Sequence, residues 1–197
     1  MLTNIYFQSD IFAVDKISSK KFTKYSYKQR QKQLSSLEDQ IIEAILKDNI
    51  QVVKKYFDQG GNPNQFFSLA VSNGSMKSVK LMLSRGVNVN SFDKRGYTPL
   101  MIAAQYTYRA GSSMTEFLLS KGAQVNAKTS RGTTPLMFAS WAVGSHHENE
   151  YVKVIRMLIA KGAKVNTKNQ IGETPLSIAK KGNWKKIIAV LNKAGAK

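Results

Sequence analysis

The stretch Gly132-Thr133-Thr134-Pro135-Leu136 decides the fold of this chain, because its pattern occurs three times. The other two copies are Gly96-Tyr97-Thr98-Pro99-Leu100 and Gly172-Glu173-Thr174-Pro175-Leu176. An alanine follows each leucine by three residues, and another glycine precedes each copy by ten residues. Self-similarity at a period of a few tens of residues predicts a solenoid of stacked units. Solenoids usually bind partners along an extended face and rarely perform chemistry.

Each copy is typical of the start of a helix. Threonine is a favourable N-cap, because its hydroxyl accepts a hydrogen bond from an otherwise unpaired backbone amide, and proline suits the first helical position. A second amphipathic run precedes each copy, and the glycine after that run suits a left-handed helix stop. These runs and glycines are Val79–Leu83 with Gly86, Phe117–Leu119 with Gly122, and Val154–Ile159 with Gly162. The sequence therefore predicts units made of helix, turn, helix and projecting loop.

On these residues the chain resembles ankyrin-repeat proteins. The family pattern is a glycine, Thr-Pro-Leu two residues later, a pair of helices and then Gly-Ala-x-Val-Asn, and residues 95–166 contain it twice nearly intact. The resemblance implies an all-α fold, an ankyrin-repeat solenoid of stacked helix-turn-helix units with projecting β-hairpin-like loops. It specifies the fold closely and says almost nothing about the particular function.

The chain is expected to have two parts. Residues 1–36 form a basic N-terminal leader, largely flexible, in which Lys20 to Gln33 are flexible or helical. Residues 37–197 form the ankyrin-repeat domain, with about five units whose outer members are atypical, as capping repeats must be. The predicted units are 37–64 (cap), 65–94, 95–130, 131–170 and 171–197 (cap).

The spacing of the copies departs from the family pattern. The family period is ~33 residues, whereas Thr98 and Thr134 lie 36 residues apart and Thr134 and Thr174 lie 40 apart. We place the excess in loops between the two helices of a unit, at 105–113 and 141–150. Surface loops tolerate insertions at little cost in closure entropy, so the added length is weak support for a role.

Two further departures concern single positions. The histidine that often follows Thr-Pro-Leu in the family is replaced by Met101, Met137 and Ser177. We therefore expect its local hydrogen bonding to be absent from these units. The projecting loop between the first two units is missing at Asn64-Gln65.

Positive charge is the second strong feature of the sequence. Thirty Lys and Arg against twelve Asp and Glu give a formal net charge of +18. Residues 1–36 hold seven basic and two acidic side chains. Residues 37–64 hold three basic and five acidic side chains, and residues 65–197 hold twenty basic and five acidic ones. Such an excess favours acidic partners, namely nucleic acid, anionic lipid or an acidic protein surface. For the cations beside the three helix-ending glycines, a role at the helix C-terminus is preferred.

The loops between consecutive units are the best candidate site. Their basic residues would align along one edge of a stacked array, and the resemblance implies that loop tips and first helices build a concave binding surface. A basic edge beside aromatic side chains suits an acidic, partly apolar protein segment. For Met137 or Trp141 alone, packing against neighbouring first helices explains the residue at least as well. The predicted binding residues are Phe92, Lys94, Arg95, Tyr97, Met101, Lys128, Arg131, Met137, Trp141, Lys168, Ile171 and Lys181.

No catalytic or metal-binding pattern stands out. The two histidines, His146 and His147, are adjacent and precede Glu148 and Glu150. A metal site needs convergent ligands with supporting hydrogen bonds, so a solvated polar loop is preferred. No serine lies in a strand-to-helix elbow, no glycine-rich phosphate loop follows a strand, and cysteine is absent from the sequence. We therefore expect a protein that is not an enzyme and needs no cofactor or metal.

Two classes of function remain. The preferred one is a monomeric protein–protein interaction module with an acidic partner, and resemblance to short bacterial ankyrin-repeat proteins implies an adaptor, an inhibitor or a host-directed effector. The alternative is charge-driven binding of nucleic acid or an anionic membrane, to which the basic, tyrosine-containing leader could contribute.

The expected location follows from what the sequence does not contain. No apolar run approaches the ~20 residues that span a membrane, and Met1–Val14 lack the order of a signal peptide. We expect a cytoplasmic protein, or an effector secreted without a classical signal peptide.

Overall fold

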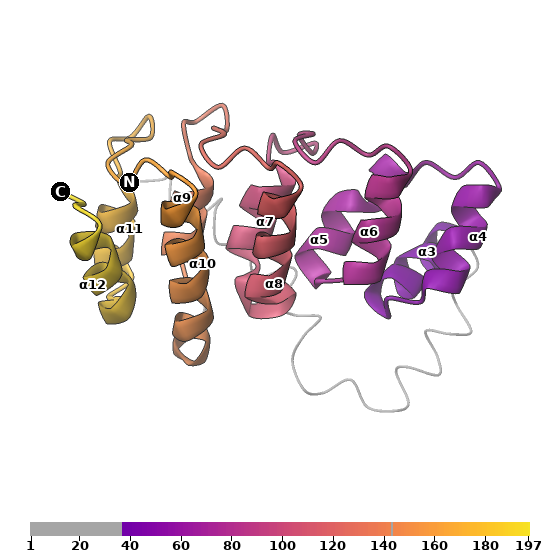
Figure 1. Cartoon of the computed structure of the whole chain (residues 1–197), viewed down its shortest axis with the longest axis horizontal. Helices are drawn as coiled ribbons and strands as arrows, with labels where there is room; N and C mark the ends of the chain where they lie inside the picture. The colour runs from indigo at the N-terminus through magenta and orange to yellow at the C-terminus, as the bar shows by residue number, and fades with distance from the viewer. Residues whose placement is uncertain (1–36, 143) are drawn as a thin grey trace, which may run out of the picture. The chain divides into compact units, whose positions relative to one another are not determined.

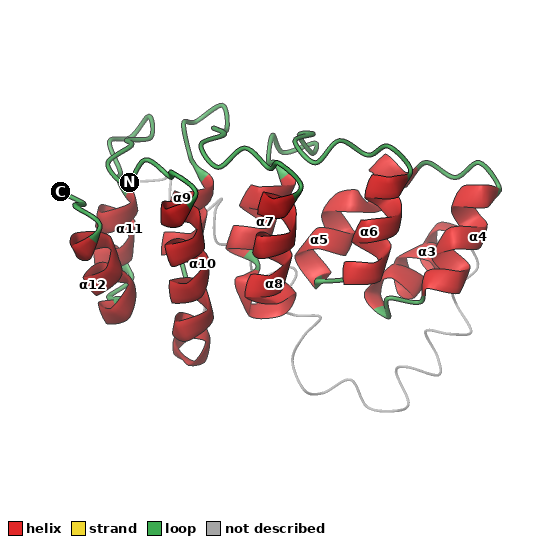
Figure 2. Ribbon diagram, viewed as in Figure 1, coloured by secondary structure: helices red, strands yellow, loops and turns green. Residues whose placement is uncertain are grey.

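The computed structural model describes residues 37–142 and 144–197. Within these ranges every regular element is a helix (Figure 2), so the predicted all-α fold is confirmed. The leader predicted for residues 1–36 lies outside the described residues. Residues 41–197 form one compact unit.

The helices of the described residues occur in pairs along the chain (Figure 1). The pairs are α3 (Leu37–Leu46) with α4 (Ile50–Asp58), α5 (Phe67–Asn73) with α6 (Met76–Ser84), α7 (Pro99–Gln105) with α8 (Thr107–Ser120), α9 (Pro135–Ser140) with α10 (Glu148–Ala160), and α11 (Pro175–Lys181) with α12 (Lys185–Lys193). Two short 3-10 helices are η1 (Pro63–Phe66) and η2 (Ser145–His147). First helices contact first helices of the next pair, as α7 contacts α9, and second helices do the same, as α8 contacts α10.

The predicted helix starts are confirmed at all three Thr-Pro-Leu copies. Thr98, Thr134 and Thr174 are N-caps with extended backbone, and a proline occupies the first turn of the helix that follows. Each threonine hydroxyl accepts a hydrogen bond from the backbone amide three residues later, at 3.4, 3.3 and 3.1 Å respectively. These bonds satisfy amides that have no partner inside the helix.

The predicted left-handed stops are also confirmed. Gly86, Gly122 and Gly162 have φ values of 87°, 84° and 86°. In each case the residue after the glycine donates its amide to a carbonyl in the last turn, as Val87 does to Met82 at 3.2 Å. A Cβ atom added at these glycines would meet nothing within 4 Å. Glycine is therefore favoured here by the backbone conformation and not by lack of space.

The asparagine of each Val-Asn phrase joins one unit to the next. The side chain of Asn126 donates to the carbonyl of Gly162 at 2.9 Å and accepts from the amide of Lys164 at 2.9 Å. Asn90 and Asn166 make the same two bonds to the units that follow them, at 2.8 to 3.1 Å. Because both ends of the amide group are used and both partners are backbone atoms, these residues fix the stacking of neighbouring units.

The extra residues of the 95–130 unit do not form the loop expected at 105–113. Helix α8 begins at Thr107, so most of the excess adds a turn to the second helix, and Gly111 (φ 68°, ψ 165°) kinks it. Helical hydrogen bonding resumes at once after α7, since the amide of Ala110 donates to the carbonyl of Tyr106 at 2.9 Å. In the next unit the described residues between α9 and α10 are irregular apart from η2.

Tyr151 on α10 supports the end of α7 in the preceding unit. Its side chain is fully buried, and its hydroxyl donates to the carbonyl of Gln105 at 2.9 Å. The last carbonyls of a helix lack partners within the helix, and a buried tyrosine hydroxyl needs a partner as well. One contact satisfies both groups and positions α10 against the neighbouring pair.

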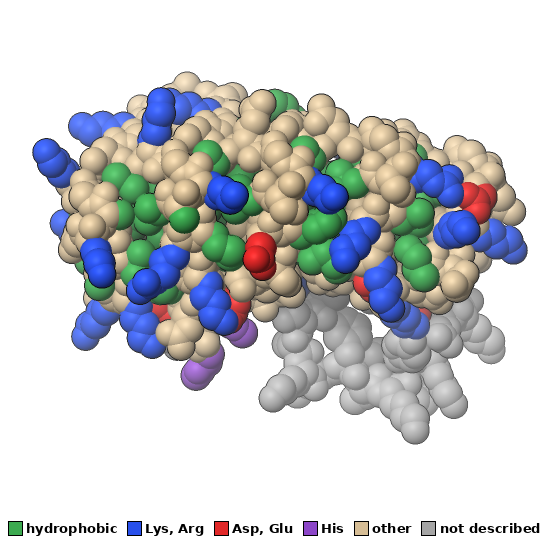
Figure 3. Space-filling model, in the orientation of Figure 1, with side chains coloured by type: hydrophobic (Ala, Val, Ile, Leu, Met, Phe, Trp, Pro, Cys, Tyr) green, Lys and Arg blue, Asp and Glu red, His purple; other side chains and the backbone are tan. Residues whose placement is uncertain are grey.

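Basic side chains are spread over the side of the molecule on which the second helices lie. Figure 3 views this side, and Lys and Arg appear across it with few Asp or Glu between them. Apolar side chains show through between the charged ones.

Candidate functional site

The three complete inter-unit loops have the same construction. Asp93, Thr129 and Asn169 each accept a side-chain hydrogen bond from the backbone amide four residues later, at 2.9, 3.1 and 2.8 Å. Their own amides donate to the carbonyl of that same later residue, at 2.9 to 3.0 Å. Each loop is therefore closed like a hairpin, although the described residues of the loops contain no strand. The hairpin-like form was predicted, and the closing side chains were not.

Free lysine side chains lie at the tips of these loops. Lys94, Lys128 and Lys168 are exposed, and their ammonium groups make no hydrogen bond or ion pair with any described residue. The last two loops are joined directly, because the Gln170 amide donates to the carbonyl of Arg131 at 2.9 Å and its side chain to that of Ser130 at 3.0 Å. The tips of these two loops therefore lie side by side.

Arg95 and Tyr97 belong to a local cluster. The Arg95 guanidinium pairs with Asp93 at 3.0 Å and lies over the Tyr97 ring, 4.8 Å from its centroid. The Tyr97 ring packs edge-on against Phe138, with centroids 4.9 Å apart. Burial would lower the pKa of Arg95, but hydrogen bonds to Tyr106 and Asp93 hold that pKa above its usual value. Arg95 is thus a partly neutralised cation, unlike the free lysines.

Three predicted apolar residues are exposed to solvent. The exposed fractions are 60% for Phe92, 49% for Trp141 and 78% for Ile171. Two of them, Phe92 and Ile171, lie in the loops, whereas Trp141 follows the last residue of α9, at the far end of that helix from its N-cap. Among the described residues only Leu46 and Val52 are other large hydrophobic side chains with comparable exposure.

Met101 and Met137 require a correction. They were predicted to lie on an exposed strip, but their side chains are only 0% and 1% exposed. Helix α7 packs against α5, α8 and α9, and α9 packs against α7, α10 and α11, so all sides of these short helices are covered. Helices α7 and α9 therefore add almost nothing to the exposed surface, which in these units is supplied by the loops and by Trp141.

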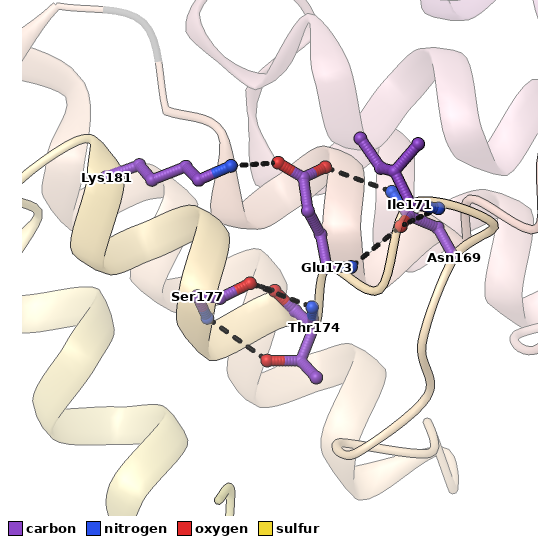
Figure 4. Close-up of polar contacts among 6 residues, drawn as sticks. All are labelled: Asn169, Ile171, Glu173, Thr174, Ser177 and Lys181. Carbon is purple, nitrogen blue, oxygen red and sulfur yellow. Dashed lines mark hydrogen bonds and ion pairs between the residues drawn. The ribbon is translucent and has the colours of Figure 1, made fainter.

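Lys181 is also bound within its own unit. Its ammonium group pairs with Glu173 at 2.5 Å (Figure 4), and the other oxygen of Glu173 accepts from the Asn169 side chain at 3.0 Å. Burial would raise the pKa of Glu173, but the hydrogen bonds from Lys181 and Asn169 outweigh it and hold the pKa below its usual value. Lys181 is exposed, but much of its charge is already compensated.

At the position after Thr-Pro-Leu, where the family often has histidine, we expected no local hydrogen bonding. This expectation is wrong for Ser177. The Thr174 amide donates to the Ser177 hydroxyl at 2.9 Å, and the Ser177 amide donates to the Thr174 hydroxyl at 3.1 Å (Figure 4). This reciprocal pair is a capping box. At Met101 the same slot offers only a thioether sulfur, 3.4 Å from the Thr98 amide, which is a weak acceptor.

Tyr106 and Phe138 belong to the surface cluster and were missed. Tyr106 follows α7 and hydrogen-bonds to Arg95, while Phe138 supports the Tyr97 ring from α9. Tyr106 lay in a segment interpreted as an inserted loop, and Phe138 lay inside an apolar helix. Contact between consecutive units brings Phe138 to Tyr97, whereas Tyr106 reaches Arg95 within its own unit.

The described residues give no support to a metal centre or a membrane span. No group of three or more His, Asp or Glu among them could hold a metal ion. His147 instead lies near the Tyr108 ring, with centroids 6.1 Å apart. Within the same residues, no helix combines the length and the apolar character needed to cross a bilayer.

Comparison with known proteins identifies the repeat. The family described as ankyrin repeats (3 copies) matches this sequence over residues 41–129 and 67–169, which is more than half of the chain. A search among curated proteins finds no match.

Proposed function

Because the chain belongs to the ankyrin-repeat family, we propose that it binds an acidic, partly apolar segment of a protein partner along its loop tips. Ankyrin repeats are generally protein–protein interaction modules, and the family is typically non-enzymatic. The surface we propose, called the loop-tip surface, consists of Phe92, Lys94, Arg95, Tyr97, Lys128, Arg131, Lys168 and Ile171. Trp141 is a separate candidate contact at the other end of α9.

The observation that carries this proposal is the coexistence of free cations and exposed apolar groups. Lys94, Lys128 and Lys168 lack partners among the described residues, and Phe92 and Ile171 lie at opposite ends of the same series of loops. Apolar anchors supply most of the affinity at protein interfaces, while complementary charge speeds association and selects the partner. A partner segment with carboxylates between two apolar residues would contact both the lysines and the apolar side chains.

The proposal predicts what the partner looks like, so it can be tested without knowing the partner. A displayed library of short peptides is selected against the full chain, and the enriched peptides are sequenced. We expect an excess of Asp and Glu with at least one aromatic or aliphatic residue. Binding of an enriched peptide is then measured in variants of the full chain.

Two triple variants separate the loop tips from the overall charge. Replacement of Lys94, Lys128 and Lys168 by Glu should weaken the peptide at least about tenfold, because three favourable charge contacts become repulsive. The control replaces Lys77, Lys80 and Lys185 on the second helices by Glu, changes the net charge equally, and should leave affinity within about twofold. Equal losses in both variants, or peptides without acidic residues, would contradict the proposal.

Phe92 and Ile171 test the apolar part separately. Phe92→Ala and Ile171→Ala should each weaken the same peptide, since contacts with apolar anchors are lost. Their exposure means that the free energy of unfolding should change little. Unchanged affinity in both variants would show that Phe92 and Ile171 do not contact the partner, and would contradict this part of the proposal.

A further inference from the structure

We propose that a second surface, on the second helices, binds an anionic lipid bilayer. This second-helix face consists of the exposed side chains of α6, α8, α10 and α12 and of the residue that follows each helix. It is distinct from the loop-tip surface and does not depend on the proposed protein partner.

Exposed charge on this face is almost entirely positive. Ten exposed side chains on it are Lys or Arg, whereas Glu116 is the single exposed acid among its described residues. Some cations are compensated, because Arg85 pairs with Asp58 and Lys153 pairs with Glu150. The Lys186 side chain donates to Asn149. The other seven side chains make no hydrogen bond or ion pair with any described residue: Lys77, Lys80, Lys121, Arg156, Lys161, Lys185 and Lys193.

The apolar side chains on this face are less exposed than those that could anchor a protein partner at the loop tips. None of the exposed large hydrophobic side chains of the described residues lies on α6, α8, α10 or α12. Leu119 and Met157 line a shallow groove of about 160 Å³ between α8 and α10. Ligand pockets typically measure about 300–1,000 Å³. An interaction at this face therefore depends mainly on charge. The partner that suits such a face is a polyanion.

The arrangement of the cations favours a bilayer over nucleic acid. Single strands need exposed aromatic rings on which bases stack. Phe117 on α8 is half-buried, and the ammonium groups of Lys80 and Lys121 both lie 5.6 Å from its centroid. The cations also extend across four neighbouring helices, roughly 30 Å at the usual interhelical spacing. A sheet of lipid headgroups can meet such a two-dimensional array at once, while a duplex offers its phosphates along narrow strands.

The electrostatic attraction between these cations and an anionic leaflet is large enough for peripheral membrane binding. A Lys or Arg near an anionic leaflet raises partitioning by roughly fivefold. Several free cations together would give binding at low ionic strength, and screening would remove most of it as salt increases.

The test is co-sedimentation of the full chain with vesicles. The probe is phosphatidylcholine with about one third phosphatidylserine, and the reference is phosphatidylcholine alone. We expect binding to the first only, with a steep loss between about 50 and about 200 mM salt. Replacement of Lys77, Lys80, Arg156 and Lys185 by Glu should reduce partitioning at least about 100-fold. Lys77 and Lys185 lie in first turns, where Glu favours the helix, so this variant should remain folded.

The matched control replaces four loop cations, Lys94, Lys128, Arg131 and Lys168, by Glu and has the same net charge. It should keep most of the vesicle binding. Equal losses in both variants would show that total charge, and not this face, drives binding, and would overturn the proposal. Tighter binding to a generic duplex than to the anionic vesicles at equal salt would also overturn it, in favour of nucleic acid. If the chain binds neither the anionic vesicles nor the duplex at low salt, the proposal is wrong.

Discussion

At the scale of single residues, Met137 and Trp141 lie four positions apart and have opposite surroundings. Met137 is 1% exposed because three neighbouring helices close around α9, whereas Trp141 is 49% exposed where that helix ends. Both were predicted as contacts from the same apolar pattern. Residue type and spacing do not distinguish a side chain that faces the next unit from one that faces solvent.

Asn126 provides a residue-scale prediction about the stacking of units. Asn126→Ala removes two hydrogen bonds and leaves the Gly162 carbonyl and Lys164 amide without them. We expect the free energy of unfolding to fall by about 1–3 kcal/mol, measured by urea denaturation. Asn192→Ala on the exposed side of α12 is the control and should be nearly neutral. Equal effects would show that Asn126 does not couple the units.

Glu173 provides a prediction about pH. Its pKa is lowered in the folded state, because the hydrogen bonds from Lys181 and Asn169 outweigh the effect of burial. The stabilisation by ionised Glu173 is therefore complete above the unfolded pKa of glutamate, about 4.3, and is lost as pH falls through the lower folded pKa. The difference in urea midpoint between the wild type and Glu173→Gln should shrink below that pH. A difference that stays constant from neutral to acidic pH would contradict this.

At the scale of elements, helices are capped across unit boundaries. Asp48, at φ 48°, accepts hydrogen bonds from the amides of Lys77 and Ser78 at 3.0 and 2.9 Å and so caps α6 from the preceding unit. Glu148 does the same for α12, accepting from the amide of Lys186 at 2.8 Å. Such caps combine hydrogen bonding with a favourable interaction between a carboxylate and a helix N-terminus.

Asp48→Ala should destabilise the fold by about 1–2 kcal/mol, because the first turn of α6 loses its acceptors. Asp48→Asn keeps one oxygen acceptor and tolerates positive φ, so it should recover much of the loss. Thermal or urea unfolding monitored by circular dichroism measures both. If Asn and Ala are equally destabilising, hydrogen bonding is not the basis of the effect.

At the scale of the whole repeat unit, stability depends on neighbours. In a repeat array each unit contacts only its neighbours, and the end units must cover the apolar faces of the inner ones. In residues 41–197 the last pair has this role, because α11 packs on α9 and α12 packs on α10. The polar outer side of α12 includes the exposed Lys185, Lys186 and Lys193.

Deletion of residues 171–197 should therefore lower the urea midpoint of the remaining chain and increase its aggregation. The apolar sides of α9 and α10 would face water, and exposed apolar patches promote association. Circular dichroism and light scattering measure the two effects. An unchanged midpoint with no aggregation would mean that the preceding units are self-sufficient.

Much of the fold could be predicted from the sequence because its determinants are local. Thr98 caps a helix through an amide three residues away, and Gly86 ends one through its own φ, so neither depends on distant contacts. The loop position of the lysines could be predicted for the same reason, since each loop lies between a helix-ending glycine and a Thr-Pro-Leu helix start. The helical turn added before Gly111 was missed, because glycine and aromatic residues there resemble a loop.

The sequence alone determined the repeated helix pairs, their starts and stops, and the excess of positive charge. The tertiary structure decided which of those charges are compensated. Lys181 pairs with Glu173, whereas Lys94, Lys128 and Lys168 have no side-chain partner among the described residues. It also buried Met101 and joined Arg95 to Tyr106. Caps and stops depend on neighbours within a few positions. Exposure depends on packing between elements that are distant along the chain, and charge pairing depends on which side chains the folded unit brings together.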